Sequence, residues 1–280
     1  MFRSILAGLL VTAAFATDVG AQPSSNINDY VLFAVSGIKT KGPTISDGDV
    51  GVNVVDGRLL APRSFIGPNS VVASDRVRFD KNPSNTVLQQ LFANVVEMGP
   101  PGTPFTPPII ADVKAACGFP DPFPPCASGN DVDVPVGTTA TLAPGAYGKV
   151  RVHGTQLSHG ELQLSGGLYV FCDLKVGRAA EVQVQNPSTI DVAGRVAFGP
   201  GSSLGPDSGS GLVASDIQLY VAGKIVKLTR DSFSNARICA PDSKMRLTQG
   251  GVHIGVYVAG FIRTEGVTLS LGSPSGAFVD

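Results

Sequence analysis

Residues 150–198 read VRVHGTQLSHGELQLSGGLYVFCDLKVGRAAEVQVQNPSTIDVAGRVAF. Apolar and polar side chains alternate there in short stretches, such as Leu162-Gln163-Leu164 and Val182-Gln183-Val184, and a Gly, Pro, Asn or Ser follows nearly every stretch. A period of two is typical of strands that bury one face. Strands this short and this closely spaced, with no helical pattern between them, predict a solenoid wound from β-strands.

The same alternation covers most of residues 131–271 and includes Ile217-Gln218-Leu219 and Val252-His253-Ile254. Three strands per coil would give coils of about twenty residues, which is common in solenoid repeats. A β-sandwich is the main competing fold, but it would have fewer, longer strands joined by two-residue hairpin turns. We therefore predict an all-β chain that forms a right-handed parallel β-helix with one flanking α-helix.

Residues 82–98 predict that flanking helix. Asn82 can cap it and Pro83 fits its first turn. Apolar residues then recur at helical spacing, namely Val87, Leu88, Leu91, Phe92, Val95 and Val96. A short helical turn is expected over 109–116, between Pro-rich loops. We expect residues 82–130 to form one insertion, after early strands at 30–36, 48–55 and 64–79.

The N-terminus predicts a secretory signal peptide over residues 1–21. Arg3 precedes an apolar run of about a dozen residues, and Val19-Gly20-Ala21 resembles a cleavage site. Residues 22–280 would then form a single β-helix domain. No later segment approaches the roughly 18 apolar residues of a membrane-spanning helix, so no membrane span is expected. The predicted location is the periplasm or the extracellular medium, and the sequence leaves both open.

The composition of the chain limits the classes of partner that we expect. The formal net charge is −1, so the chain as a whole has no basic excess, and no nucleic-acid partner is expected. The 34 Gly and 21 Pro residues fit a turn-rich β protein.

Four cysteines, Cys117, Cys126, Cys172 and Cys239, suggest two disulfides in an exported chain, with three possible pairings. Cys117 and Cys126 bracket a short Pro-rich loop, which favours pairing them and leaves Cys172 with Cys239. No CxxC motif is present, and His153, His159 and His253 lack paired ligand spacing, so no zinc site is predicted.

The sequence offers no catalytic constellation. Asp131-x-Asp133 and Asp47-Gly48-Asp49 are interpreted as turn residues, and the Ser/Gly-rich stretch 199–211 as coil corners. Each His is interpreted as a solvated strand or turn residue. We predict no catalytic, cofactor-binding or metal-binding residues and no cofactor, and the chain is not expected to be an enzyme.

Two stretches resemble the bacterial ice-binding (adhesin-like) β-solenoid family. One is Asn28–Asn53, with YVLFAV and GPTISDGDVGV; the other is Leu142-Ala143-Pro144-Gly145-Ala146-Tyr147. The resemblance implies early strands, a helix and then late coils, in an exported protein, and it raises the possibility of ice binding. The stretch 194–228 also resembles uncharacterised exported bacterial β-helix proteins, which implies no function.

The expected outward positions argue against an ice-binding face, which needs a flat, regular array of small hydroxyl and methyl groups. They hold long and varied side chains: Lys149, Arg151, His153, Glu161, Gln163, Lys175, Gln183, Gln185, Arg195, Gln218, Lys224, Lys227 and Arg246. The main prediction is an exported, non-enzymatic protein with a structural, adhesive or surface-binding role, its partner a surface, a matrix polymer or a second copy. The alternatives are an ice-binding protein and, second, a polysaccharide-active β-helix enzyme.

Overall fold

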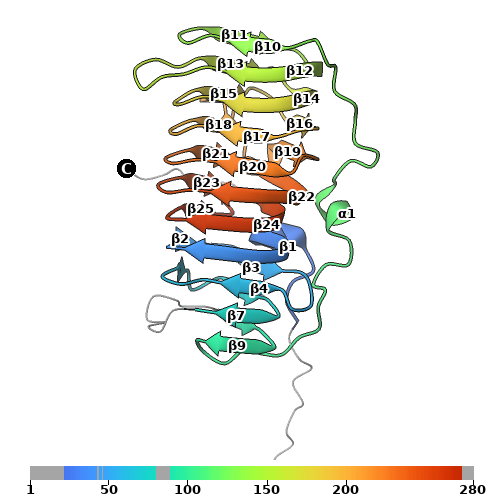
Figure 1. Cartoon of the computed structure of the whole chain (residues 1–280), viewed down its shortest axis with the longest axis vertical. Coiled ribbons are helices and arrows are strands. Elements are labelled where there is room, and N and C mark those ends of the chain that lie inside the picture. The colour runs from blue at the N-terminus through green and yellow to red at the C-terminus, as the bar shows by residue number, and fades with distance from the viewer. Residues whose placement is uncertain (1–21, 43, 46, 80–88, 273–280) are drawn as a thin grey trace, which may run out of the picture.

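The chain forms a parallel β-solenoid of about 11 coils, which confirms the predicted fold class (Figure 1). This computed structural model describes residues 22–272 except 43, 46 and 80–88. The predicted signal peptide, residues 1–21, lies outside the described residues.

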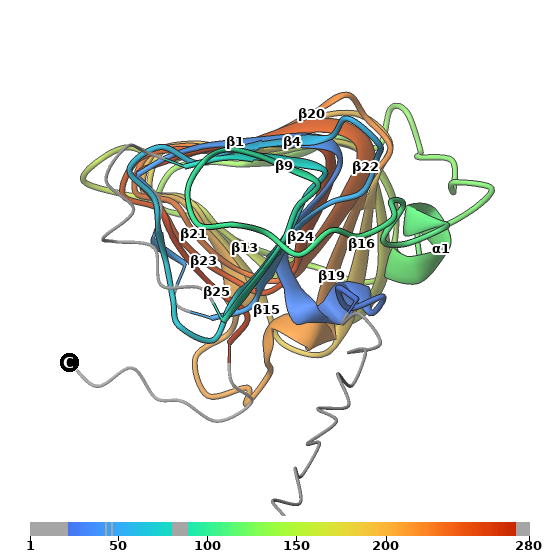
Figure 2. The ribbon, with the colours of Figure 1, turned by 90° about the horizontal axis from the view of Figure 1, so that it is seen from below.

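Each full coil is a triangle, and its sides stack into three faces (Figure 2). A 16-stranded sheet, sheet A, bends around one corner and forms two of the faces, and the 9-stranded sheet B forms the third. Five long strands of sheet A run through that corner and belong to both of its faces: β1 (Tyr30–Lys41), β12 (Gly145–Val152), β14 (Gly167–Val176), β22 (Arg237–Leu247) and β24 (Tyr257–Glu265).

Shorter strands complete sheet A. With the N-terminal halves of the long strands, one face contains β3 (Asp49–Val52), β6 (Val71–Ala73), β8 (Gln90–Phe92), β16 (Ser188–Val192) and β19 (Ile217–Val221). With the C-terminal halves, the other contains β4 (Arg58–Leu60), β7 (Arg76–Arg78), β9 (Val95–Met98), β10 (Val132–Val134), β17 (Val196–Phe198) and β20 (Ile225–Leu228).

Sheet B stacks one short strand from each of nine coils. These strands are β2 (Thr44–Ile45), β5 (Phe65–Ile66), β11 (Thr139–Leu142), β13 (Glu161–Leu164), β15 (Glu181–Val184), β18 (Ser203–Pro206), β21 (Phe233–Asn235), β23 (Val252–Ile254) and β25 (Thr268–Ser270). Every strand pair in both sheets is parallel, as stacking of successive coils requires.

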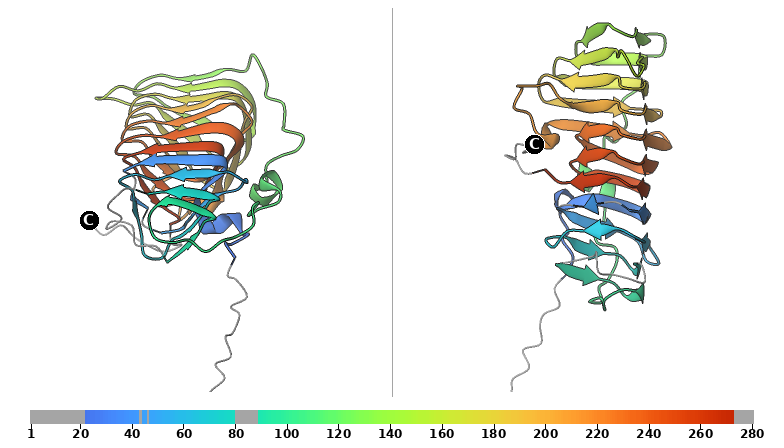
Figure 3. Two further views of the ribbon diagram at one scale, coloured as in Figure 1. Left: turned by 60° about the horizontal axis from the view of Figure 1, so that its bottom comes forward. Right: turned by 90° about the vertical axis from the view of Figure 1, so that its left-hand side faces the viewer.

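The order of coils in space differs from their order in the chain. The chain starts in the middle of the stack with β1 and winds to one end at β9, and a connection over residues 99–131 then leads to the other end (Figure 1). The later coils wind back from β10 until β24 pairs with β1, with Val258 beside Phe33 and Arg263 beside Lys39. The right-hand view of Figure 3 shows this seam, where the first coil meets the last.

The interior is a stack of apolar side chains. Period-two alternation turns every second residue inward, and the parallel register places like positions above one another. One inward column contains Leu174, Val196, Val226, Met245 and Ile262, all fully buried. Burying each such side chain contributes roughly 1.5–3 kcal/mol, which stabilises the stack without any repeated sequence motif.

The connection covers one face of sheet A, which we call the covered face: the N-terminal halves of the long strands with β3, β6, β8, β16 and β19 (Figures 2 and 3). Ile110 and Val113 of the connection form a second apolar cluster with Phe33, Val256 and other outward residues of this face. The Asn53 side chain fixes the connection by accepting from the Ile110 amide and donating to the Ile110 carbonyl, both at 2.8 Å.

The prediction of a helix over residues 82–98 is wrong for residues 89–98, the part of this segment that the structure describes. Residues 90–92 and 95–98 are strands β8 and β9, while residues 82–88 lie outside the described residues. The helical pattern arose because β8 is buried on both sides: Leu91 faces the interior, and Phe92 packs under Phe105 of the connection. The one α-helix of the described residues, α1 (Val113–Cys117), overlaps the predicted turn 109–116.

The four cysteines form two disulfides, but the predicted pairing is wrong. Cys117 pairs with Cys239 and Cys126 with Cys172, with Cα–Cα distances of 6.3 and 5.1 Å. The reason is the path of the connection. Its Pro-rich loop extends along the stack instead of folding back, so that Cys117 reaches β22 and Cys126 reaches β14.

Candidate functional site

The described residues contain no group of three His, Cys, Asp or Glu side chains that could hold a metal ion. None of the helices within the described ranges has the length and apolar character that crossing a bilayer requires. A shallow hollow of about 240 Å³ is bordered by Pro187, Thr189 and Asp216, and Asp216 caps its own turn by accepting from the Val213 amide. The one carboxylate that borders the hollow is therefore already hydrogen-bonded to the backbone, and no basic side chain of the described residues borders the hollow with it.

The acidic pairs singled out in the sequence hold the backbone. Asp131 accepts from the Lys149 amide and Asp49 from the Val71 amide, each at 2.8 Å. Asp47 accepts from the Leu271 amide at 2.7 Å, and Asp133 pairs with His153 at 2.7 Å on the surface. These contacts join adjacent coils and support the interpretation of these residues as turn and edge residues.

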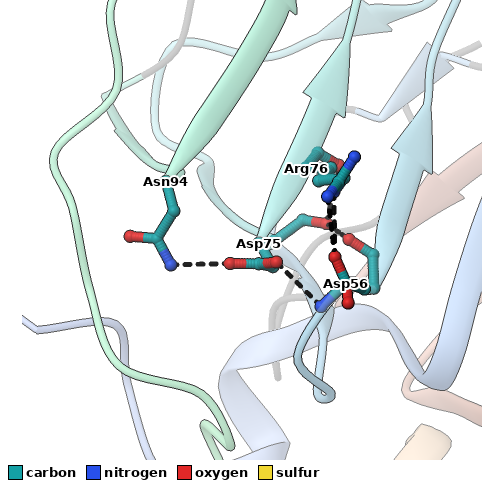
Figure 4. A network of polar contacts seen from close by, with 6 residues as sticks. Asp56, Asp75, Arg76 and Asn94 are labelled. Carbon is teal, nitrogen blue, oxygen red and sulfur yellow. Dashed lines mark hydrogen bonds and ion pairs between the residues drawn. The ribbon is translucent and has the colours of Figure 1, made fainter.

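A similar network lies near the lower end of the stack (Figure 4). The buried Asp75 carboxylate accepts from the Asp56 amide at 2.8 Å and from the Asn94 side chain at 2.6 Å. Asp56 in turn pairs with Arg76 at 2.8 Å, and Asn94 accepts from the Phe105 amide. The network ties three coils to the start of the connection.

His253 departs from its sequence interpretation as a solvated residue. It is buried inside the solenoid, where its Nδ1 lies 2.8 Å from the Ser234 hydroxyl, which also contacts the Tyr257 hydroxyl at 2.7 Å. Burial lowers the pKa of His253 to about 3. A Ser–His pair could activate a nucleophile, but both residues are fully buried, so a substrate could not reach them.

Asp191 is a second buried titratable group. It lies beside Tyr220 on the covered face and is only 2% exposed. Burial raises the pKa of this carboxyl to about 6. A buried carboxyl with a raised pKa can mark a catalytic acid, but the buried Oδ1 atom of Asp191 has no hydrogen-bond partner within the described residues.

Sheet B is one of the two open faces, and its outward side chains change character along the stack. At its upper end Glu161 and Glu181 stand in register, each accepting from a glutamine amide of its own strand at 2.7 and 2.9 Å. Below β15 the charges stop. One outward column there contains Ser203, Phe233, Val252, Thr268 and Phe65, and the next contains Asn235, Ile254 and Ser270.

We call these eight residues the uncharged band. They are partly or well exposed except Ile254, and Phe65 is 42% exposed. Their backbone is a stack of in-register parallel strands, which lie about 4.8 Å apart. The band is therefore a regular surface of hydroxyl, amide and apolar groups.

The second open face is the sheet A face that contains β4, β7, β9, β10, β17 and β20 with the C-terminal halves of the long strands. We call it the basic face, because most of its exposed outward residues are Lys or Arg: Lys39, Arg58, Arg78, Lys149, Arg151, Lys175, Arg195, Lys227, Lys244, Arg246 and Arg263. The sequence identified several of these as outward, but their common face depends on the register of coils of unequal length.

The fold is similar to solved ice-binding proteins, which confirms the resemblance predicted from sequence. One is from the Antarctic ascomycete Antarctomyces psychrotrophicus, with 11% identity and a TM-score of 0.44 over 89% of this chain and 97% of that one. Another is a glycosylated ice-binding protein from an Arctic yeast, with 12% identity and a TM-score of 0.41 over 94% and 99%. The Shewanella frigidimarina ice-binding domain has 14% identity and a TM-score of 0.37 over 91% and 99%.

No family model and no curated protein matches the chain. The similar structures correct the main functional prediction: they are described as ice-binding proteins, not as adhesive or structural proteins, and so match the alternative prediction. Identities this low leave the activity of this chain to be argued from its own surface.

Proposed function

We propose that the protein binds ice through the uncharged band of sheet B. The observation that carries the proposal is the absence of Lys, Arg, Asp and Glu from the described outward positions of these two columns, from Ser203 to Phe65 in one and from Asn235 to Ser270 in the other. It contrasts with the charged residues on the remainder of sheet B and on the basic face.

The chemistry of the band suits a crystal of water. Ice presents a flat and rigid lattice, so a binding surface must be flat and rigid as well. Stacked parallel strands supply rigidity, because each strand of the band except the terminal β5 is hydrogen-bonded on both sides, and all pack on the apolar interior. Charged side chains would hold their own hydration shells, and removing water from a charge is costly. Ser203, Thr268 and Ser270 can instead hydrogen-bond to ordered water beside apolar Val252 and Phe65.

The other faces suit ice less well. The covered face is closed by the connection and two disulfides. The basic face carries long, flexible, charged side chains at adjacent positions. The Ser234–His253 pair is buried where a substrate could not reach it, which agrees with a non-enzymatic role.

We also propose that residues 22–280 act as one exported domain released from a signal peptide at residues 1–21. The two disulfides are typical of proteins in an oxidising compartment.

Inhibition of ice recrystallisation and thermal hysteresis, measured on the purified protein, test the ice-binding proposal. Thr268→Lys places a long charged side chain in the middle of the band, and we expect it to abolish most of either activity. The matched control is Thr139→Lys, because Thr139 is an exposed threonine in the same outward column of sheet B but lies beside Glu161, outside the band.

Activity in the wild type and in Thr139→Lys, with loss in Thr268→Lys, supports the proposal. Absence of both activities in the folded wild type would overturn it, and so would equal loss in the two variants. Thermal unfolding of all three proteins verifies that the substitutions leave the fold intact.

A further inference from the structure

The basic face concentrates positive charge in register. Six of its outward residues form a column, interrupted once at Ala197, that we call the basic stripe: Arg151, Lys175, Lys227, Arg246, Arg263 and Lys39. Neighbouring strands lie about 4.8 Å apart, so the stripe presents a nearly periodic row of cations along the solenoid axis. Figure 1 looks onto this face, between β12 and β1.

Ion pairs within the protein do little to neutralise the stripe. Among the described residues, one carboxylate lies in register with a stripe residue, that of Asp133 beside Arg151 at the upper end of the column, and Asp133 pairs with His153. Within the described residues, none of its six members has a carboxylate within 4.0 Å, whereas Arg76 and Arg78, lower on the same face, pair with Asp56 and Glu97. All six side chains are exposed.

This arrangement costs stability. Lys227 lies directly beside Arg246, Arg246 beside Arg263, and Arg263 beside Lys39. Like charges directly opposite one another on adjacent strands are destabilising. A net charge of −1 provides no compositional reason for this accumulation. Residues that oppose the stability of a fold often serve binding.

We propose that the basic face binds an extended anionic polysaccharide, with its chain along the basic stripe. Such a polymer carries one carboxylate or sulfate at regular intervals, and the length of a sugar ring is close to the distance between adjacent strands, so successive anions can meet successive cations. Arg pairs with carboxylates and sulfates through two parallel hydrogen bonds, and Lys acts as a point charge.

Single-stranded nucleic acid fits this face less well. Its binding sites combine basic grooves with aromatic rings on which the bases stack. The outward rows of the basic face contain one aromatic residue among the described residues, Phe261, and it is half-buried. The face therefore favours a chain recognised by its charges alone.

The test measures binding of the purified protein to polygalacturonate, dextran sulfate, uncharged dextran and oligothymidylate by calorimetry in 50 and 200 mM NaCl. We expect binding to polygalacturonate or dextran sulfate that weakens by at least about tenfold between the two salt concentrations, because bound cations release counterions from the polymer. The two anionic polymers distinguish carboxylate from sulfate as the ligand. Uncharged dextran should not bind.

The decisive variant is Lys227→Gln, Arg246→Gln, Arg263→Gln, which should weaken binding by at least about tenfold in 50 mM NaCl. A matched variant, Arg63→Gln, Arg178→Gln, Arg230→Gln, removes the same charge from turns outside the stripe and should weaken binding by less than about twofold. Removal of the repulsion should leave the first variant at least as stable as the wild type, so misfolding would not mimic the result.

Failure of the wild type to bind either anionic polymer in 50 mM NaCl would overturn the proposal. Equal weakening by the two triple variants, or tighter binding of oligothymidylate than of both anionic polysaccharides, would also overturn it. The basic stripe lies on a different face from the uncharged band, so the result is independent of ice binding.

Discussion

The basic face and the uncharged band are built from the same coils, yet their surfaces differ in every respect that matters for binding. Val226 and Met245 behind the basic face and Leu204 and Leu269 behind the band are equally buried, and the strands have the same parallel stacking. Only the alternate, outward residues differ. A solenoid thus separates the residues that specify the fold from those that specify the partner, and one stack can present two unrelated surfaces.

The largest expected effect concerns the covered face, which the connection over residues 99–131 closes. Cys117→Ser with Cys239→Ser removes a link between residues 122 apart, and loop-closure entropy predicts a loss of about 5 kcal/mol in the free energy of unfolding. Urea titration of the oxidised proteins measures it. The pair Cys126→Ser and Cys172→Ser, which are 46 residues apart, should cost about 4 kcal/mol. A loss below about 1 kcal/mol in both would mean that the cover is held by its apolar contacts alone.

A smaller effect distinguishes the interiors behind the two open faces. His253, behind the band, has a folded pKa of about 3 against 6.5 for the free side chain, so it contributes stability that is complete above pH 6.5 and is lost as the pH falls. Between pH 7 and pH 5 this loss is about 2 kcal/mol. His253→Met should remove this pH dependence. Between pH 7 and pH 5 the free energy of unfolding of the variant, measured by urea titration, should therefore fall by about 2 kcal/mol less than that of the wild type.

Asp191 changes the stability with pH in the opposite direction, but it is present in both the wild type and the His253→Met variant. Its folded pKa of about 6 lies above 3.8, so its penalty in the folded state is present above pH 6 and disappears as the pH falls. Asp191 therefore cancels when the two proteins are compared. Identical pH dependence of the wild type and His253→Met would show that His253 is not buried as a neutral group.

The smallest effect alters the gap in the basic stripe. Ala197 lies between Lys175 and Lys227, so Ala197→Glu would place a carboxylate beside two unpaired cations and should raise stability by about 0.2–1 kcal/mol per pair. The gain should shrink in 1 M NaCl, while binding to polygalacturonate weakens. Ser203→Glu, in the uncharged band, should give no gain. Equal gains at the two sites would contradict the contrast drawn between the faces.

The alternation of apolar and polar residues predicted the solenoid well, because every second residue of a strand must be apolar to fill the interior of each coil. It failed at β8, where Leu91 faces inward and Phe92 faces the connection, so that neighbouring apolar residues imitate the stripe of a helix. No local pattern distinguishes a strand that is buried on both sides from a helix.

The surfaces were predictable residue by residue but not as faces. Lys175 and Lys227 could be identified as outward, yet Ala197, not another cation, lies between them, and the coil that contains Lys227 carries an excursion over residues 207–216. The disulfide partners depend in the same way on the path of the connection along the stack. Such juxtapositions follow from register, which a single sequence does not reveal.

The seam between β1 and β24 has a consequence for synthesis of the protein. The coil of β1 leaves the ribosome early, but its upper neighbour consists of residues 257–270, among the last of the described chain to emerge. Until then, β1 presents an open strand edge of twelve residues, and such an edge can pair with another nascent chain. Closure of the stack is therefore a late, long-range event, and the yield of folded protein should depend on how well that edge is protected before the last coil arrives.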